Sequence, residues 1–519
     1  MRVITFMNRK VIIALIAIVV IIGASAFVLT NSSNTSNTSI NVDANALEDR
    51  GNLIVDSESL DENNGLYHTD SADTNGILIK NGGALKLAKS IINKTGDTAT
   101  TGDDADFYGV NSAILVNTNG TLDISDVEIN TNSKGSNGIF VTNAEASESG
   151  NSSGGASGEG GQPPEAQGSG EGGQPPEAQG SGDGGQPPEM PSSDGAGGAQ
   201  GGNGGGEQPS QSSVEGSTEA NIKNVKITTH SDKSRGLDAT YNGVINAENV
   251  VINTDGQSCA ALATDRGEGH VHVKNSDINT GVSKTSGRGS PLIYSTGNIT
   301  LENTNGTSYV SQIACIEGKN SIEVTNSQLT GAAEGNRQDG DEYVDLGGVF
   351  IYQSMSGDAD VGTSLFNAKD STLSIAEDSS VYKEAPMLHI TNTACVVNLE
   401  NTQLNFGSGV FLEASGQNQW GTQGSNGGVC ELNTDNEKID GNVIVDEISS
   451  LNWTMKNTEF KGAINSTGNT TVKVGEGSTW TLSGDSSVSS LELSGNIEYG
   501  EYSLTVNGQT YNSSNPFKG

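Results

Sequence analysis

The chain has 519 residues and a formal net charge of −37, because 63 acidic residues stand against only 26 basic ones. Contacts to phosphate need clustered Lys and Arg, so this balance argues against a nucleic-acid-binding protein. Only 32% of the residues are hydrophobic and 70 are glycine, which argues against one large globular core and favours a repeat fold whose short units each bury a few side chains.

Residues 1–30 are expected to be a targeting segment. Three basic residues precede an apolar run over 11–22, and the small residues ASA follow at 24–26. The small residues fit a signal-peptide cleavage site, whereas the length of the apolar stretch also fits an uncleaved membrane anchor. Both alternatives place the rest of the chain outside the cell, with membrane contact only through this segment. Residues 31–48 begin NSSNTSNTSI and are expected to form a polar tether.

One phrase recurs over residues 49–144 and again over 216–510. It consists of a short alternating strand, one polar residue and a second short strand, as in LDISDVEINT, ANIKNVKITT and VHVKNSDINT. From Asn224 to Asn326 the central polar residues are 25, 26, 28 and 23 residues apart. A period in the mid-twenties with polar turns predicts a solenoid of β-coils. The central polar residues are Asp126, Asn224, Asn249, Asn275, Asn303, Asn326, Asp370, Asn401 and Asn457.

Another short strand precedes each of these phrases, as in RGLDATY, CAALATD and SPLIYST. Each coil should therefore hold at least two strands and a third, more variable stretch. We expect inward aliphatic side chains to fill a narrow core, asparagines at matching turns to stack in hydrogen-bonded ladders, and glycines to supply the corners with positive φ. The cysteines lie in or beside apolar runs and are expected to be buried and free of disulfides. They are Cys259, Cys315, Cys395 and Cys430.

Residues 145–215 interrupt the repeat. The sequence GGQPPEAQGSG occurs there twice, followed by a variant, with a period of 12. This composition cannot build a core, so we expect a disordered acidic insertion. At the other end, EYSLTVNGQTYNSS suggests a closing hairpin or a final coil, and 511–519 is expected to be a tail.

The phrases SRGLDATYNG, CAALATDRGEG, SPLIYSTGNI and FGSGVFLEASG resemble those of secreted, adhesin-like β-helix proteins of anaerobic bacteria and methanogenic archaea. The resemblance covers about residues 50–510 apart from the insertion. It implies a right-handed parallel β-helix, the fold that such proteins share with pectate lyases. The expected fold class is therefore all-β, with an N-terminal signal or transmembrane helix added.

Charged residues gather in two successive coils. ATDRGEGH carries Asp265, Arg266 and Glu268, and SRGLDATYNG carries Arg235 and Asp238. Adjacent coils lie about 4.8 Å apart, so these side chains are candidates for one catalytic cluster. The resemblance implies what such a cluster would do, because polysaccharide lyases of this fold use carboxylates for Ca²⁺ and an Arg or Lys as base. The alternative, which we favour, is a salt-bridged turn of little energetic weight.

Asp238 stands out because its column of the repeat is otherwise apolar or small. A carboxylate among apolar residues is expected to have a raised pKa and is a candidate for function, unless it simply pairs with Arg235. The alignment of the repeat places Asp238 with Phe140, Leu262, Ile293, Ala314, Phe350 and Leu388.

Two further sites are candidates. The loop EGNRQDGDEYVD carries the carboxylates of Asp339, Asp341, Glu342 and Asp345, and calcium prefers such oxygen clusters, although the spacing is not that of an EF-hand. Trp420 lies in the glycine-rich loop SGQNQWGTQGSNGG, where it can stack on a sugar or a partner protein, or fold back onto the coil.

These observations predict a non-catalytic, adhesin-like or structural protein, extracellular and either anchored at the cell surface or released. Its repetitive acidic surface would make many weak contacts with glycans or proteins of another cell. The alternative is a carbohydrate-active enzyme, a lyase or a hydrolase. Three or more carboxylates converging with an Arg or Lys in one groove would favour the enzyme.

Overall fold

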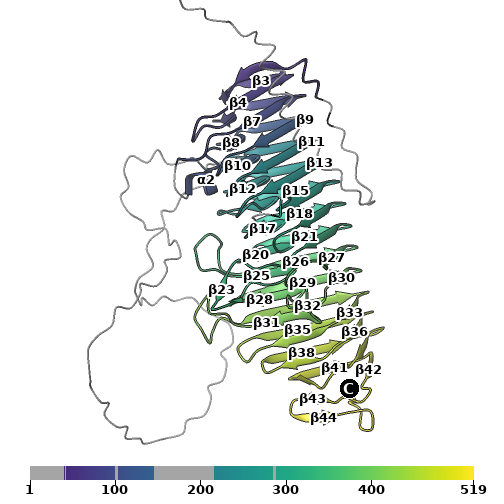
Figure 1. Ribbon diagram of the computed structural model, residues 1–519. Helices are drawn as coiled ribbons and strands as arrows, with labels where there is room; N and C mark the ends of the chain where they lie inside the picture. The colour runs from purple at the N-terminus through teal and green to yellow at the C-terminus, as the bar shows by residue number, and fades with distance from the viewer. Residues whose placement is uncertain (1–39, 41, 100–102, 145–215, 285–287, 519) are drawn as a thin grey trace, which may run out of the picture. The chain divides into compact units, whose positions relative to one another are not determined.

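Stacked β-coils make up the part of the chain that the computed structural model describes (Figure 1). The segment expected to be a signal or anchor, most of the tether and the whole insertion lie outside the described residues. Within the described part, no helix has the length and apolar character needed to cross a membrane. The described residues are 40, 42–99, 103–144, 216–284 and 288–518.

The first side of the stack, called face 1, is a sheet of 13 parallel strands. Its strands are three to five residues long. They are β2 (Leu53–Asp56), β5 (Ile77–Lys80), β8 (Ile114–Asn117), β10 (Ile139–Thr142), β12 (Leu237–Thr240), β14 (Leu262–Thr264), β17 (Ile293–Ser295), β20 (Ala314–Glu317), β25 (Val349–Tyr352), β28 (Leu388–Thr391), β31 (Val410–Ala414), β34 (Asn442–Val445) and β37 (Ile464–Ser466).

A sheet of 22 strands bends to form faces 2 and 3. Three long strands run across both faces: β9 (Thr121–Thr131), β11 (Glu219–His230) and β13 (Val244–Asp255). Face 2 also contains β3 (Ser59–Asn63), β6 (Ala84–Ala88), β15 (His270–Lys274), β18 (Asn298–Glu302), β21 (Ser321–Thr325), β26 (Thr363–Lys369), β29 (Thr393–Glu400), β32 (Gly428–Asp435), β35 (Ser450–Lys456), β38 (Asn469–Val474) and β41 (Ser490–Leu493).

Face 3 takes one further short strand from most coils. These strands are β1 (Glu48–Gly51), β4 (Gly65–Thr69), β7 (Ile91–Lys94), β16 (Asp277–Thr280), β19 (Asn305–Ser308), β22 (Gln328–Gly331), β27 (Thr372–Ile375) and β30 (Gln403–Asn405). A separate parallel sheet follows with β33 (Lys438–Asp440), β36 (Glu459–Lys461), β39 (Thr479–Thr481) and β42 (Asn496–Glu498).

The corner between faces 2 and 3 is a single residue in the left-handed conformation. All nine central polar residues of the repeat occupy it, with φ between 47° and 63°. The amide of Asn249 donates to Oδ1 of Asn224 at 2.9 Å, and the amide of Asn436 donates to Oδ1 of Asn401 at 3.1 Å. The asparagine ladder is thus confirmed. The expectation of glycine is wrong for this corner, because asparagine tolerates positive φ and also bonds to its neighbour.

The regions 49–144 and 216–510 form one continuous stack. Strand β9 pairs with β11 in register, so that Leu122 lies beside Ala220 and Ile129 beside Ile227, on either side of the insertion in the sequence. Inward aliphatic side chains from all coils join in one core. All four cysteines are buried and free, as predicted.

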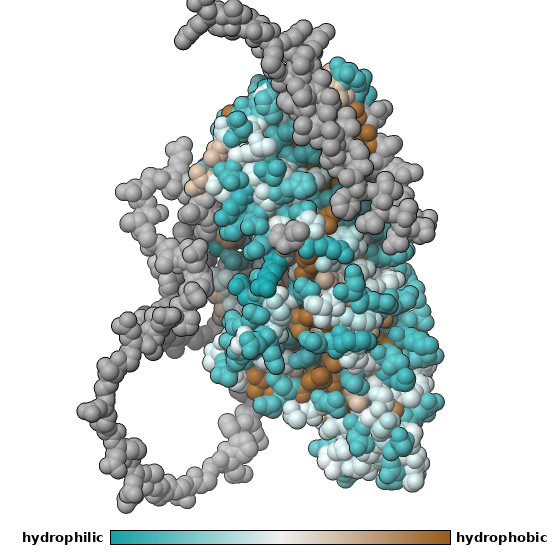
Figure 2. Space-filling model, viewed as in Figure 1, coloured by the Kyte–Doolittle hydropathy of each residue, from teal (hydrophilic) through white to brown (hydrophobic). Residues whose placement is uncertain are grey.

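The C-terminal end closes with a small three-stranded sheet of β40 (Ser486–Val488), β43 (Leu504–Val506) and β44 (Gln509–Tyr511). Strands β43 and β44 are antiparallel, which confirms the closing hairpin. The residues after it also pack, since Phe517 lies 5.1 Å from the Tyr511 ring and its N–H donates to the Tyr499 hydroxyl. Hydrophilic residues cover most of the visible face (Figure 2).

Candidate functional site

A cavity of about 360 Å³ lies on the outer surface of face 1. We call it the groove. Tyr294 of β17 and Cys315 of β20 line its floor, because the middle residue of each face 1 strand points outward while its neighbours point into the core. A short helix and three loops surround it. They are α2 (Asp103–Tyr108), the loop 332–347 with its hairpin β23 (Gln338–Asp339) and β24 (Glu342–Tyr343), the loop 353–362 and the loop 415–427.

Arg235, just before β12, is the centre of a buried ion cluster at one end of the groove. Its guanidinium lies 2.7 Å from the carboxylate of Asp265 and 3.5 Å from that of Asp238. Asp106 of α2 lies 3.2 Å away on another side and also binds Lys233 at 2.8 Å. One guanidinium therefore faces three carboxylates, of which Asp238 is fully buried.

Two carboxyl groups of the cluster, those of Asp265 and Asp238, hold protons at unusually high pH. Burial raises the pKa of Asp265 to about 6, although Arg235 acts in the opposite direction. Burial, and then the charge of Asp265, raises the pKa of Asp238 well above its ordinary value. Because the two carboxyl groups interact, their titration belongs to the pair. A carboxylic acid that stays protonated near pH 6 beside a groove can act as a general acid.

The register of face 1 corrects the column assigned to Asp238. It pairs with Phe140 and Ala263, and along the same row come Tyr294, Cys315 and Phe350, so only Phe140 and Phe350 of the expected neighbours belong there. Leu262, Ile293, Ala314 and Leu388 lie one residue away and point into the core. Asp238 is therefore on the outer row of the sheet, beneath α2, where the groove begins.

Arg266 and Glu268 do not belong to the ion cluster around Arg235. Both lie in the corner after β14 with positive φ, and the guanidinium of Arg266 bonds to Asp358 at 2.6 Å and stacks 3.8 Å from the centre of the Phe107 ring. Glu268 pairs with Lys319 at 2.5 Å on an exposed surface. Arg266 thus joins α2 to the loop 353–362, and Glu268 does not line the groove.

A further carboxylate lies beside the floor residue Tyr294. Glu317 of β20 is 1% exposed and accepts the hydroxyl of Tyr294 at 2.9 Å. It also accepts the N–H of Ser354 at 3.2 Å. The tyrosine and the carboxylate are held rigidly by this network, which fixes the polar groups that a ligand would meet.

The acidic loop 332–347 forms one wall of the groove. Asp345 is buried, and its carboxylate accepts the backbone N–H groups of Asn336 at 2.8 Å and Arg337 at 3.1 Å, which anchors the loop. Asp339 accepts a hydrogen bond from Asn418, whereas Asp341 and Glu342 are exposed. Over the described part of the chain, no three or more His, Cys, Asp or Glu residues are arranged to hold a metal ion. The four carboxylates expected to bind calcium therefore do not converge.

Trp420 lines the groove and also packs onto the coil. Only 7% of it is exposed, and its ring lies 5.5 Å from that of Phe350 and 5.2 Å from that of Tyr352. Trp420 therefore folds back onto face 1, and in this position it also lines the cavity.

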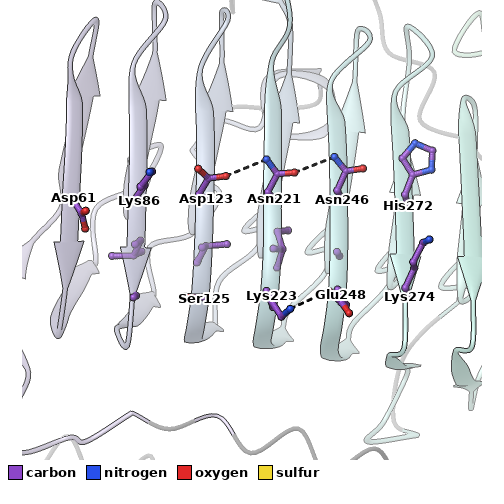
Figure 3. Close-up of a pocket in the computed structure, with 15 residues that line it drawn as sticks. Asp61, Lys86, Asp123, Ser125, Asn221, Lys223, Asn246, Glu248, His272 and Lys274 are labelled. Carbon is purple, nitrogen blue, oxygen red and sulfur yellow. Dashed lines mark hydrogen bonds and ion pairs between the residues drawn. The ribbon is translucent and has the colours of Figure 1, made fainter.

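Face 2 carries a larger but flatter hollow of about 610 Å³. Figure 3 shows its side chains in rows across successive strands. They bond to one another: the amide of Asn221 donates to Asp123 at 3.1 Å, and Lys223 pairs with Glu248 at 3.3 Å. Further along, Lys274 pairs with Glu302. This face alternates in charge instead of being uniformly acidic, and its polar groups are largely satisfied.

The chain is an all-β protein with long parallel sheets stacked in register, the arrangement of a parallel β-solenoid. No protein-family model matches it, and no curated protein is significantly similar to it. The fold and the groove are therefore the basis for proposing a function.

Proposed function

We propose that the protein is an extracellular, adhesin-like protein with a right-handed β-helix, and that it binds glycans in the groove on face 1. The N-terminal segment would anchor it at the cell surface or be removed on secretion. Its partners would be glycans, free or carried by proteins, on the surface of another cell.

The observation that carries this proposal is the convergence of aromatic and charged groups in one cavity. Trp420 and Tyr294 give the cavity aromatic surface for the apolar side of a sugar, while Arg235, Asp265 and Arg337 offer groups for its hydroxyls. A mostly preformed concave site with a few fixed polar groups is typical of small-ligand binding.

The purified full chain on a glycan array tests the proposal. Arg337 is exposed at the rim, so Arg337→Ala should weaken binding about tenfold without unfolding the protein. Lys438→Ala, which removes an exposed charge outside the groove, is the matched control and should bind like the wild type. Binding of no glycan by the wild type, or equal binding by both variants, would contradict the proposal.

A second candidate is a carbohydrate-active enzyme. Three carboxylates meet Arg235 at one end of the groove, which is the arrangement expected to favour an enzyme, and the groove-lining Asp265 has a pKa of about 6. Cleavage would depend on the protonated acid and decline above pH 6. Incubation with a panel of polysaccharides would separate a lyase, which leaves unsaturated ends, from a hydrolase, which makes new reducing ends without unsaturated ones. Asp265→Asn should abolish either activity, and Glu268→Gln, outside the groove, should not.

A further inference from the structure

The groove is short along the axis of the stack. Its floor runs over β17, β20 and β25, which at about 4.8 Å per strand is only about 10 Å between the outer two strands. Its volume of about 360 Å³ is at the small end of the range for ligand pockets, about 300 to 1,000 Å³. This is room for one or two sugar rings.

Helix α2 closes the N-terminal end. It lies over β12, where the hydroxyl of Thr240 donates to the carbonyl of Phe107 at 2.9 Å and the rings of Tyr108 and Tyr241 stack at 5.7 Å. Asp106 adds the ion pair with Arg235. The outer surface of face 1 is thus covered on this side of the groove.

The loop 415–427 closes the C-terminal end. The amide of Gln417 lies 3.2 Å from Nε2 of His389 on β28, and Trp420 covers Phe350 on β25. The amide of Gln419 donates to the carbonyl of Gln338 at 2.6 Å, so this loop also holds the hairpin of the loop 332–347. The two loops together cover face 1 at β28 and part of β25.

The ion pair of Arg266 and Asp358 closes a third side. Arg266 follows the carboxyl end of β14, and Asp358 follows the carboxyl end of β25. Strands β17 and β20 lie between these two, so the ion pair, at 2.6 Å, extends across the carboxyl ends of β17 and β20. The fourth side lies at the amino ends of the strands, and in the described structure Ser258, Gly289 and Arg337 line it.

We infer that the groove is a dead end that receives the terminal sugar of a glycan and excludes internal stretches of a chain. A polymer that passed along the axis would meet α2 or the loop 415–427, and one that crossed the strands would meet the pair of Arg266 and Asp358. This inference rests on the proposed glycan binding and specifies which part of the glycan is recognised.

Titration with oligosaccharides of increasing length, built on a glycan that the array identifies, tests the inference. Trp453 and Trp480 are fully buried in the core, so a ligand-induced change of tryptophan fluorescence reports Trp420. The wild type should bind every oligosaccharide longer than a disaccharide with the same affinity per oligosaccharide molecule. O-methylation of one terminal sugar should weaken binding at least tenfold. An affinity that rises about tenfold with length would overturn the inference while leaving glycan binding intact.

A variant that opens the third side provides an independent measurement. Asp358→Ala removes the ion pair with Arg266 and should let longer or end-capped chains bind. Asp360→Ala, in the same loop but paired with Lys319 outside the groove, is the matched control and should keep the selectivity for ends. Unchanged selectivity in Asp358→Ala would overturn the inference. Failure of every glycan to bind the wild type would instead refute the proposed function, and the inference with it.

Discussion

A single corner residue decides how each coil turns from face 2 to face 3. Asn249 has a φ of 63° and donates its amide to Asn224 of the coil before. In the left-handed region a residue with a Cβ loses about 1–2 kcal/mol, which asparagine partly recovers through local hydrogen bonds. Corner and ladder are thus two functions of the same side chain.

Substitution of Asn249 separates these two functions. Asn249→Ala should lower the free energy of unfolding by about 2 kcal/mol, since it loses the hydrogen bond and keeps the strained φ. Asn249→Gly should cost about half as much, because glycine adopts this φ freely. Urea denaturation measures both values, and a glycine variant less stable than the alanine variant would contradict this explanation.

Glu437 occupies a position that other coils fill with serine or threonine. Its Oε1 accepts the N–H of Thr402 at 2.7 Å, as Oγ of Ser478 does for Thr458 at 3.1 Å in a neighbouring coil. Glu437 is only 3% exposed, and burial raises its pKa to about 7. A hydroxyl group suffices for the hydrogen bond to Thr402. The second carboxylate oxygen of Glu437 is therefore the reason why burial of the charged side chain is unfavourable and the pKa is raised.

Stability should therefore fall as the pH rises through the range from about 4.5 to 7. In this range the folded protein holds a proton on Glu437 that the unfolded chain releases, so the contribution is fully present below pH 4.5 and lost above pH 7. Glu437→Ser should remove this pH dependence and stabilise the protein at pH 8 by on the order of 2 kcal/mol. Thermal melts of both proteins at pH 4.5 and 8 test this, and parallel pH profiles would contradict it.

Helix α2 is the element whose place depends most on tertiary contacts. Six residues are too few for a stable isolated helix. It is held by the ion pairs of Asp106 and by the stacking of Phe107 under Arg266. The end of the groove that it closes is therefore only as rigid as these contacts.

Phe107→Ala should release the helix without melting the sheets. The stacking with Arg266 is lost, so amide hydrogen exchange of residues 103–108 should accelerate at least tenfold while exchange in β12 and β14 stays slow. Tyr309→Ala, which removes an exposed aromatic ring elsewhere, is the control. Unchanged exchange in α2 would show that the ion pairs of Asp106 suffice.

At the scale of the whole molecule, the described coils on either side of residues 145–215 form one stack. These coils are joined by the in-register pairing of β9 and β11 and by the hydrogen bond from the Thr218 hydroxyl to Oδ1 of Asn143 at 2.7 Å. The two points at which the chain leaves and re-enters the described stack are therefore adjacent.

Replacement of residues 145–215 by a short glycine–serine linker should leave the fold intact and raise the melting temperature slightly. A shorter loop costs less closure entropy, by about 1–2 kcal/mol for this change in length. Circular dichroism melts of the two proteins measure the difference. A large fall in melting temperature would mean that the insertion contributes to the stack.

The repeat explains why so much of the fold was predictable. Alternating apolar residues and corner asparagines recur coil after coil, so each coil repeats the evidence for the same strands, as with Asn224, Asn249 and Asn275. The face 1 strands are only three to five residues long. A one-residue slip exchanges the inner and outer rows, which is how Asp238 was assigned neighbours that in fact point into the core.

The candidate site was predictable only within neighbouring coils. Arg235, Asp238 and Asp265 lie in successive repeats, so the strand spacing alone brings them together. Asp106 and Trp420 come from parts of the chain far from that cluster in sequence, and no local pattern relates them to it.

The sequence by itself therefore determined the coils, their corners and the axial order of the side chains, because neighbouring repeats interact through one fixed spacing. Only the tertiary structure decided which loops fold over face 1, because irregular loops follow no repeat and are placed by specific contacts such as that of Arg266 with Asp358. Through this contact, the charged corner after β14 forms one side of the groove.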